Sequence, residues 1–440
     1  MTARIALAVL LLAAPQDRRP NVIVILVDDL GYGDLSAWGG ADLRTPHIDA
    51  LAASGLRMDR FYANCTVCSP TRAALLTGRY PDLVGVPGVI RTNPAHSWGR
   101  LSPQAVLLPS LLKRAGYHSA IVGKWHLGLS SPDTPPERGF DHFHGFLGDM
   151  MDDYLTHLRD GRNFMRRGAE TIEPSGHATD LFTQWAVEYL RDRRDRPEPF
   201  FLYLAYNAPH TPIQPPAEWL RRVRDRAPEM PERRAALAAF IEHLDDGVGR
   251  VLKALEENGQ RDDTLVVFTS DNGGDLPAGA SNGPLRGGKQ DMWEGGLRVP
   301  TAVAWPGRIA PGGRSGAVAL TMDLFPTICE AAGLAAPEGI DGRSLLPHLL
   351  GKDAAGAERT LVWMRREGGA KYQGRDYYAA RRGPWKLLQN TPFEPYRLVN
   401  LDDDPREEKD VSAEHPKIVQ DLARVLQSHL QRAGAVPWQR

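Results

Sequence analysis

The chain of 440 residues is poor in cysteine, in net charge and in long apolar runs. Its three cysteines, Cys65, Cys68 and Cys329, are too few for a fold built on disulfide bonds. Its 53 basic residues face 54 acidic ones, a balance that gives no electrostatic reason to expect binding to nucleic acid or to an anionic membrane. No apolar run is long enough to cross a bilayer. We therefore predict no membrane span and no nucleic-acid partner.

The N-terminal residues predict an export signal. Arg4 supplies a positive charge, and an apolar run from Ile5 to Ala14 follows it, which is the pattern of a secretory signal peptide. Pro15 disfavours cleavage directly after the run, so we expect the mature chain to begin between Gln16 and Pro20. The alternative is an N-terminus that is not cleaved and has no fixed structure. We assign residues 1–19 to the export signal and a short lead-in.

Four apolar runs, separated by helical patterns, predict the centre of a parallel sheet. Asn21–Val27 is a continuous apolar, β-branched run, typical of a strand buried on both faces. We expect the other three strands at Tyr117–Val122, Phe200–Tyr206 and Thr264–Ser270. We expect helices at Leu107–Ala115, Asp180–Arg193 and Pro231–Asn258. The alternation predicts an α/β fold: a large, mostly parallel mixed sheet sandwiched by helices.

The pattern changes after about Gly333, where short alternating segments replace the long apolar runs. We expect antiparallel strands at Leu361–Arg365, Tyr377–Arg381, Trp385–Gln389 and Tyr396–Asn400. A helix over His415–Arg432 closes the chain. The sequence thus predicts a large domain over residues 20–333 and a smaller C-terminal domain over 334–440, made of an antiparallel sheet and a helix.

Polar residues follow the predicted central strands, at the sheet edge where ligands bind in such folds. Asp28 and Asp29 follow the first strand, and Asp271 and Asn272 follow the last. They offer hard oxygen ligands without sulfur or imidazole, a set that suits Ca²⁺ or Mg²⁺. Each pair alone is also an ordinary turn after a strand. Their convergence at one edge favours a metal site.

The stretch CSPTRAALLTGR, which begins at Cys68, predicts a short helix. We expect Ser69 as its N-cap and Pro70 at its first position, with Gly78 ending it. Cys68 would then lie beside unpaired N–H groups that favour an anion, and Arg72 would add a positive charge. Two plainer alternatives remain: a buried structural cysteine, or a redox pair with the cysteine three residues earlier. The redox pair lacks the small thioredoxin-like unit expected around it.

This stretch resembles the signature of the type I, formylglycine-dependent sulfatases, which are arylsulfatase-like members of the alkaline phosphatase superfamily. The signature is Cys-x-Pro-x-Arg followed by Leu-Thr-Gly-Arg. The matching residues are Cys68, Pro70, Arg72, Leu76, Thr77, Gly78 and Arg79. The resemblance implies that a maturation enzyme oxidises Cys68 to formylglycine, an aldehyde whose hydrate is the nucleophile.

Further motifs resemble those of the same family and occur in the same order. They are Asp28-Asp29, Gly123–Gly128, Asn207–Pro212, Asp271-Asn272, Gly287–Lys289 and Trp293–Pro300. The resemblance implies that the four oxygen-bearing residues, together with the formylglycine, hold Ca²⁺. One departure concerns Gly145–Asp153, where many family members carry a hydrogen-bonding serine and this chain has none.

The resemblance also implies roles for four basic residues of these motifs. Lys124 would bind a sulfate oxygen and stabilise the hydrate, and His126 would hydrogen-bond a hydroxyl of the hydrate. His210 would donate a proton to the departing alcohol, a role that suits imidazole, and Lys289 would contact the sulfate and assist the leaving group. Each motif alone has a plainer interpretation as a surface lysine or a packed loop histidine.

The predicted reaction is hydrolysis of a sulfate monoester, either an aryl sulfate or a sulfated carbohydrate. One hydroxyl of the hydrate attacks sulfur, and the second lets the carbonyl re-form as sulfate leaves. One alternative is a phosphonate or phosphodiester hydrolase of the same superfamily, which shares the cysteine signature. Another is a non-catalytic protein that binds sulfated glycans through an unmodified Cys68.

Two features favour a bacterial periplasmic or secreted enzyme over a lysosomal glycoprotein. Cysteines are few, and the one glycosylation sequon, Asn64-Cys65-Thr66, adjoins the predicted site, where a glycan would block it. Several side chains are predicted to lie in rim loops, where they would either contact a sugar or pack: Trp98, His142, His144, Tyr154 and Arg162.

Overall fold

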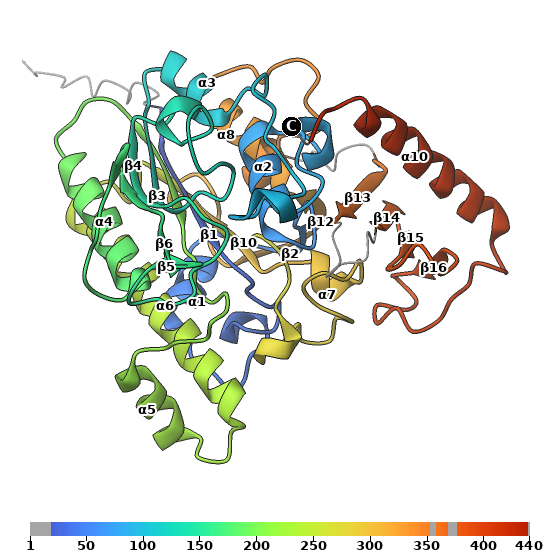
Figure 1. Ribbon diagram of the computed structural model, residues 1–440, viewed down its shortest axis with the longest axis horizontal. Helices are drawn as coiled ribbons and strands as arrows, with labels where there is room; N and C mark the ends of the chain where they lie inside the picture. Colours follow the sequence, from blue (N-terminus) through green and yellow to red (C-terminus); the bar gives the residue numbers. More distant parts are fainter. Residues whose placement is uncertain (1–18, 353–357, 368–375, 439–440) are drawn as a thin grey trace, which may run out of the picture.

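The strand Asn21–Val27 (β1) lies in the middle of a ten-stranded sheet (Figure 1). This computed structural model describes residues 19–352, 358–367 and 376–438, so the predicted export signal lies outside the described residues. From Val22 to Val27 every residue of β1 is buried, as expected for a strand with a helix layer on each face. The bounds of β1 are those that the sequence predicted.

The large sheet is parallel at its centre, and antiparallel pairs flank that centre on both sides. In spatial order its strands are β12 (Gly313–Leu320), β2 (Leu56–Tyr62), β11 (Thr301–Ala304), β10 (Thr264–Ser270), β1, β9 (Phe200–Ala205), β3 (His118–Lys124), β4 (His142–Phe146), β7 (Met165–Arg167) and β8 (Glu170–Thr171). The strands from β10 to β4 run parallel to one another. The strand β11 pairs antiparallel with both of its neighbours, and β7 does the same. A separate two-stranded sheet joins β5 (Leu158–Arg159) to β6 (Arg162–Asn163).

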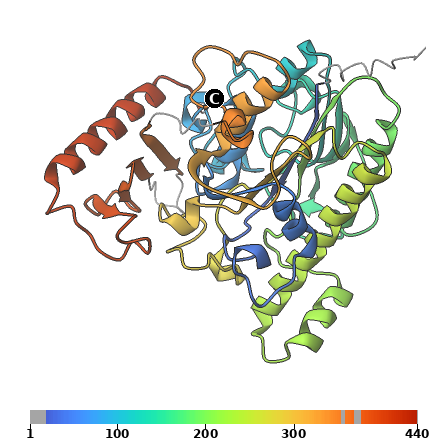
Figure 2. The ribbon, with the colours of Figure 1, turned by 180° about the vertical axis from the view of Figure 1, so that it is seen from behind.

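Helices cover both faces of this sheet (Figures 1 and 2). One layer contains α1 (Pro46–Ala53), α4 (Ala178–Asp192), α5 (Ala217–Arg226) and α6 (Glu232–Glu257). The other contains α2 (Cys68–Thr77), α3 (Leu108–Arg114) and α8 (Leu324–Ala331). Two short helices, α7 (Glu294–Leu297) and α9 (Leu346–Leu349), lie in the connections. The predicted sandwich is confirmed. Among the described residues, no helix is both long and apolar enough to cross a membrane.

The C-terminal part forms a separate four-stranded antiparallel sheet with one long helix. Its strands pair in chain order: β13 (Leu361–Arg366), β14 (Asp376–Arg382), β15 (Trp385–Gln389) and β16 (Arg397–Asn400). The helix α10 (Pro416–Gly434) packs against β14 and β15. Figure 2 shows this unit at one end of the molecule, away from α4 and α6. The predicted strands and helix are confirmed, and the domain boundary after residue 333 stays a prediction.

A buried ionic cluster joins the two sheets. Lys386 on β15 contacts Glu294 at 3.0 Å and Glu407 at 2.9 Å, and the three side chains are at most 4% exposed. The backbone N–H of Glu294 donates to Glu407 at 2.6 Å. Glu294 begins α7, five residues after Lys289. Through this cluster, the C-terminal sheet therefore stabilises the loop that carries Lys289, one of the predicted site residues.

Candidate active site

The ends of two neighbouring strands place four oxygen-bearing side chains together. In the parallel pair of β1 and β10, Val27 aligns with Ser270, so Asp28 and Asp271 leave the sheet side by side. The backbone N–H of Asp29 donates to Asp271 Oδ1 at 3.3 Å. The Asp29 backbone has a φ of 65°, a left-handed conformation that is uncommon outside glycine and turns its side chain toward the site.

The oxygen cluster has an unused acceptor at its centre. Asn272 Nδ2 donates to Asp29 Oδ1 at 2.7 Å, whereas Asn272 Oδ1 is buried and has no hydrogen-bond partner among the described residues. Buried polar atoms of that kind rarely lack a partner unless a ligand supplies it. Three buried carboxylates and one amide oxygen are the donors that Ca²⁺ or Mg²⁺ prefers. The predicted ligand set is therefore assembled and fits a hard divalent cation.

Two buried cations balance the carboxylates. Arg72 donates to Asp271 Oδ2 from Nε at 3.0 Å and from Nη2 at 2.7 Å, and Nη2 also lies 3.3 Å from Asp28 Oδ2. Lys124 forms a hydrogen bond and ion pair with Asp28. Burial alone would raise the pKa of Asp28, but Lys124, His210 and Arg72 outweigh it and hold the pKa below its usual value. The site therefore keeps Asp28 ionised and concentrates positive charge around it.

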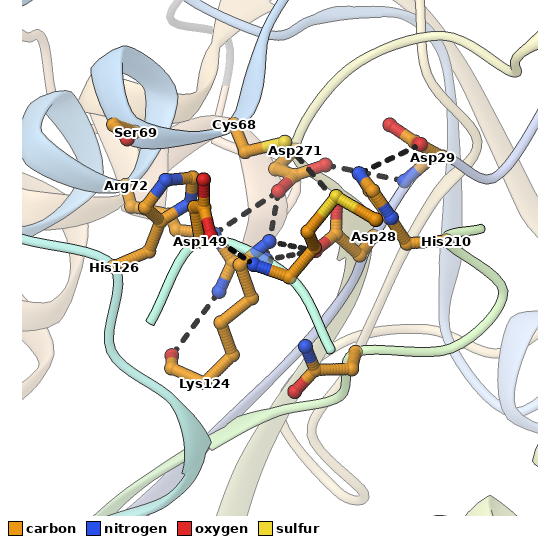
Figure 3. Close-up of polar contacts among 12 residues, drawn as sticks. Asp28, Asp29, Cys68, Ser69, Arg72, Lys124, His126, Asp149, His210 and Asp271 are labelled. Carbon is orange, nitrogen blue, oxygen red and sulfur yellow. Dashed lines mark hydrogen bonds and ion pairs between the residues drawn. The ribbon is translucent and has the colours of Figure 1, made fainter. Parts of the chain in front are cut away.

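Cys68 is the first residue of α2, and its Sγ lies 3.3 Å from Asp28 Oδ1 (Figure 3). The helix ends at Gly78, whose φ of 67° confirms the predicted C-cap. Burial, reinforced by Asp28, raises the pKa of the Cys68 thiol well above its usual value, so the unmodified side chain is not an activated thiolate. Cys65 and Cys68 are both free cysteines, and Cys65 Sγ donates to the Met364 carbonyl at 3.4 Å. The two sulfurs do not form a disulfide.

The predicted N-cap is wrong. Val67, in an extended conformation, precedes the first helical residue, and no side chain caps the helix. Ser69 and Pro70 both lie within the first turn. The Ser69 hydroxyl instead accepts a hydrogen bond from the backbone N–H of Ile90 at 3.0 Å. A tertiary contact thus takes the hydroxyl that the local pattern assigned to the cap, and the first N–H groups of α2 are left facing the site.

His126 presents a ring nitrogen without a partner. It follows β3 with a φ of 59°, and its Nε2 lies 2.8 Å from the Ile90 carbonyl oxygen. A carbonyl only accepts, so Nε2 carries the hydrogen of the neutral ring. Nδ1 is then an acceptor, and it is buried without a hydrogen-bond partner among the described residues. Burial, with Lys124 nearby, lowers the pKa of His126 well below its usual value.

His210 and Lys289 form a hydrogen-bonded pair at the other side of the cluster. Lys289 Nζ lies 3.0 Å from His210 Nε2 and 2.7 Å from Asp29 Oδ2. His210 Nδ1 lies 2.7 Å from the Thr211 carbonyl oxygen, so Nδ1 carries the hydrogen and Nε2 accepts from the lysine. Burial, followed by Lys289, lowers the pKa of His210. The pair therefore holds its mobile proton on the lysine.

Tyr154 supports this arrangement, and the sequence analysis did not identify that role. Its hydroxyl lies 2.9 Å from the carbonyl oxygens of both Asn207 and His210, and its side chain is 1% exposed. It was predicted in a loop, where it would contact a sugar or pack, and it lies in a turn and packs, with its ring buried against His177 and Phe240. No local signal marks such a residue, since its partners lie more than 50 residues away.

Of the other residues predicted in rim loops, some pack against neighbouring rings and one lies at the surface. His142 and His144 lie on β4, and His144 stacks on Trp185 with ring centroids 3.5 Å apart. The prediction of a rim loop is wrong for both histidines, because the sheet extends beyond its expected edge. Trp98 stacks on Trp438. Arg162 is exposed and lines a pocket.

Close backbone packing explains the glycines of two motifs. A Cβ atom at Gly273 would lie 1.8 Å from the Gly295 carbonyl oxygen, so the turn after Asn272 can approach α7 only as glycine. That contact, with the hydrogen bond from Lys289 N to the Gly274 carbonyl at 3.0 Å, brings the Lys289 loop to the metal-ligand cluster. The predicted site residues thus converge on one buried centre. This geometry suits a divalent cation and an anionic substrate held side by side.

Comparisons with known proteins give the family. The sulfatase family model matches residues 20–334, and a model described as the C-terminal part of N-sulphoglucosamine sulphohydrolase matches residues 288–434. N-acetylgalactosamine-6-sulfatase of Rattus norvegicus is 37% identical over 366 residues, which cover 77% of this chain and 67% of that protein. Arylsulfatase A of Homo sapiens is 31% identical, covering 92% of this chain and 82% of that protein.

A solved structure extends the likeness to nearly the whole chain. Ps i-CgsB, crystallised with k-i-k-neocarrahexaose, has a TM-score of 0.88 and 32% identity, covering 96% of this chain and 95% of that one. The chain belongs to the sulfatase family, and it is a sulfuric ester hydrolase. The family and the reaction predicted from the motifs are confirmed.

Proposed function

We propose that this chain hydrolyses sulfate monoesters of carbohydrates, using a formylglycine made from Cys68 and a Ca²⁺ ion. The observation that carries the proposal is the position of Cys68, at the first turn of α2 and 3.3 Å from Asp28. A group held there meets the helix N-terminus, the cations and the oxygen cluster together. The other proposed catalytic residues surround it: Arg72, Lys124, His126, His210 and Lys289.

The proposed metal ligands are Asp28, Asp29, Asp271 and Asn272, with the formylglycine completing the set. The buried, unpartnered Asn272 Oδ1 supports this assignment. Ca²⁺ would supply charge neutralisation for the sulfate oxygens. Arg72 and Lys124 contribute fixed positive charge beside the same position, where they stabilise the charge that shifts during transfer.

Formylglycine would supply a hydrated aldehyde with two hydroxyl groups, one to attack sulfur and one to let sulfate leave. His126 Nδ1 is the acceptor suited to take the proton of the second hydroxyl, since Nε2 is already committed to the Ile90 carbonyl. The neutral state of His126, which its lowered pKa favours, keeps that acceptor available.

The departing alcohol needs a proton, and Lys289 and His210 provide it. The hydrogen on His210 Nδ1 is held by the Thr211 carbonyl, so the transferable proton is the one shared between Lys289 Nζ and His210 Nε2. The sequence motifs assigned donation to either residue. The observed pairing supports a joint role, in which the lysine supplies the proton and the imidazole directs it.

Two similarities favour a carbohydrate substrate. Ps i-CgsB, with a TM-score of 0.88, was solved with a neocarrahexaose, and the Rattus norvegicus relative with 37% identity is named for a sulfated amino sugar. We also propose an exported bacterial enzyme, on the basis of the N-terminal pattern, and maturation by a formylglycine-generating enzyme.

Three measurements test the proposal. Peptide mass spectrometry of protein produced with a maturation enzyme is expected to show an aldehyde at position 68, and fully active protein with an intact thiol would contradict it. Turnover of 4-nitrophenyl sulfate should exceed that of a matched aryl phosphodiester. The reverse preference would favour a phosphodiester or phosphonate hydrolase, and an unmodified thiol at position 68 together with no turnover would favour a glycan-binding protein. A panel of defined sulfated sugars then tests the carbohydrate substrate.

A further inference from the structure

A polar pocket of about 470 Å³ lies between the segments 91–96 and 149–162. Two segments form its walls, and its lining residues are Arg91, Thr92, Asn93, Pro94, His96, Asp149, Arg159, Asp160 and Arg162. Its volume is within the range of small-ligand sites. None of the predicted catalytic or metal-binding residues lines it, so the function proposed above does not account for it.

Both walls begin next to groups that contact the active site. Ile90, which precedes the first wall, accepts a hydrogen bond from His126 at 2.8 Å and donates one to Ser69 at 3.0 Å. The backbone N–H of His126 donates to the Leu147 carbonyl at 3.3 Å, two residues before Asp149. Figure 3 shows Asp149 among the site residues, on the side of His126. The pocket is therefore placed to hold the part of a substrate next to its reacting sulfate.

Ion pairs, most of them partly buried, fix the walls. Arg91 Nη2 lies 2.6 Å from Glu367 Oε2, whose side chain is fully buried. Arg159 contacts Asp149 at 3.0 Å and Asp152 at 2.7 Å. The Thr92 hydroxyl donates to Asp160 at 3.3 Å and connects the two segments. Arg91 and Arg159 are thus held in place by carboxylates, which fixes the shape of the two segments before a ligand binds.

The lining contains two polar groups of opposite charge that are available to a ligand. The Arg162 side chain is exposed and makes no hydrogen bond or ion pair with other residues in the described ranges, although its backbone pairs with Arg159. Asp149 is 5% exposed. Its Oδ1 accepts from Met150 N and Arg159 Nε, and its Oδ2 has no partner in the described part of the chain. A guanidinium binds sulfate or carboxylate in bidentate fashion, and a free carboxylate oxygen accepts from a sugar hydroxyl.

We propose that this pocket is a subsite for the sugar that adjoins the sulfated one, and that it selects a second anionic group on that sugar. Arg162 binds the second sulfate or carboxylate, and Asp149 Oδ2 accepts a hydroxyl of the same ring. The inference rests on the proposed carbohydrate substrate. It makes the enzyme selective for glycans with charge on consecutive sugars, a specificity that the catalytic residues alone do not give.

The test compares disaccharide pairs that differ by one sulfate on the adjoining sugar, built on galactose, galactosamine and glucosamine. For the matured wild type, kcat/KM on the doubly charged member should exceed that on its partner in at least one pair. Arg162→Ala should lower this ratio about tenfold, the effect of one charged hydrogen bond, and Arg162→Lys should restore part of it. Arg194→Ala, which removes an exposed arginine just beyond α4, should leave the ratio unchanged.

A binding measurement separates this inference from the proposed function. Calorimetry with the full-length Cys68→Ala variant gives affinities for the same pairs without turnover, with and without Arg162→Ala. Tighter binding of the doubly charged sugar that is lost in Arg162→Ala supports the subsite. This holds even if the enzyme hydrolyses none of these carbohydrates and the proposed substrate is wrong. If Arg162→Ala changes the preference for the doubly charged sugar neither in affinity nor in kcat/KM, the subsite is overturned. Hydrolysis of the sugars would still support the proposed function in that case.

Discussion

Lys289 Nζ lies 3.0 Å from His210 Nε2, and both atoms reach the same oxygen of Asp29, at 2.7 and 3.5 Å. The carboxylate that serves as a proposed metal ligand therefore also holds the proposed proton donors. Burial alone would lower the pKa of Lys289, but Asp29 outweighs it and raises the pKa above its usual value. The lysine therefore stays charged beside His210.

The role of His210 predicts a dependence on the leaving group. His210→Ala should reduce kcat/KM for sugar sulfates by roughly 10²- to 10⁴-fold, the range for loss of general acid catalysis. The loss on 4-nitrophenyl sulfate should be much smaller, because nitrophenolate leaves without a proton. Steady-state kinetics on both substrates measure the two losses in kcat/KM. Equal losses would mean that His210 binds the sulfate and does not direct the proton.

Replacement of the nucleophile should convert turnover into a single event. In Cys68→Ser, a lone hydroxyl stays at the start of α2 beside Arg72 and Lys124, so attack on sulfur remains feasible. Without a second hydroxyl the resulting ester has no route to expel sulfate. We expect a burst of about one alcohol per site and a sulfated protein, visible by intact mass. Sustained turnover by protein verified to carry unmodified serine would refute the two-hydroxyl mechanism.

The unpartnered oxygen of Asn272 predicts a metal-dependent stability. Ca²⁺ should raise the Tm of the wild type, because a ligand that binds only the folded state stabilises it, by about 2.7 kcal/mol at a hundred times its Kd. Asn272→Ala should keep less bound calcium and lose most of the Tm shift. Elemental analysis and calorimetry with and without EGTA measure both. Stoichiometric zinc with little calcium in the wild type would contradict the proposed ligand chemistry.

The buried cluster around Lys386 predicts a large effect on stability. Lys386→Ala would leave Glu294 and Glu407 buried without their cation, which typically costs about 3–5 kcal/mol. Lys409→Ala is the matched control: its pair with Glu414, at 3.3 Å, has side chains 67% and 56% exposed and should contribute less than about 1 kcal/mol. Chemical denaturation compares them. Similar small losses in both variants would show that the cluster does not join the sheets energetically.

The stacked histidine on β4 predicts an acid-sensitive stability. Burial lowers the pKa of His144 to about 3, helped by His142 and Arg167. The unfolded state binds a proton below about pH 6.5, whereas the folded state resists protonation, so this contribution is lost as the pH falls from about 6.5 toward 3. His144→Phe keeps an aromatic ring on Trp185 without titrating, so its Tm should fall less between pH 7 and 5. A fall as steep as in wild type would contradict the prediction.

The fold was predictable where burial leaves a periodic signal. β1 and β10 lie within the predicted bounds because both faces of these strands are covered, so their apolar runs are continuous. Strands away from the centre of the sheet, such as β4 and β12, were not predicted. They are only partly buried, and their polar residues, among them His142 and His144, read as loops.

The candidate site was predictable as a set of residues, and its arrangement was not. Asp28 and Asp271 each follow an apolar run, and this position predicts hard metal ligands. Cys68 belongs to a motif in which seven residues match the sulfatase signature. The tautomers of His126 and His210 depend on the carbonyls of Ile90 and Thr211, which carry no side-chain signal. The N-cap prediction for Ser69 failed for the same reason, since Ile90, 21 residues away, takes its hydroxyl.

The sequence by itself determined the family, the α/β alternation and the side chains available for chemistry. Each of these is encoded locally, in motif spacing or in the period of apolar residues. Only the tertiary structure decided which atoms meet: the proton between Lys289 and His210, the support from Tyr154 and the pocket that contains Arg162. Those contacts join residues far apart in the chain, and their energies depend on burial and distance, which exist only once the strands have come together.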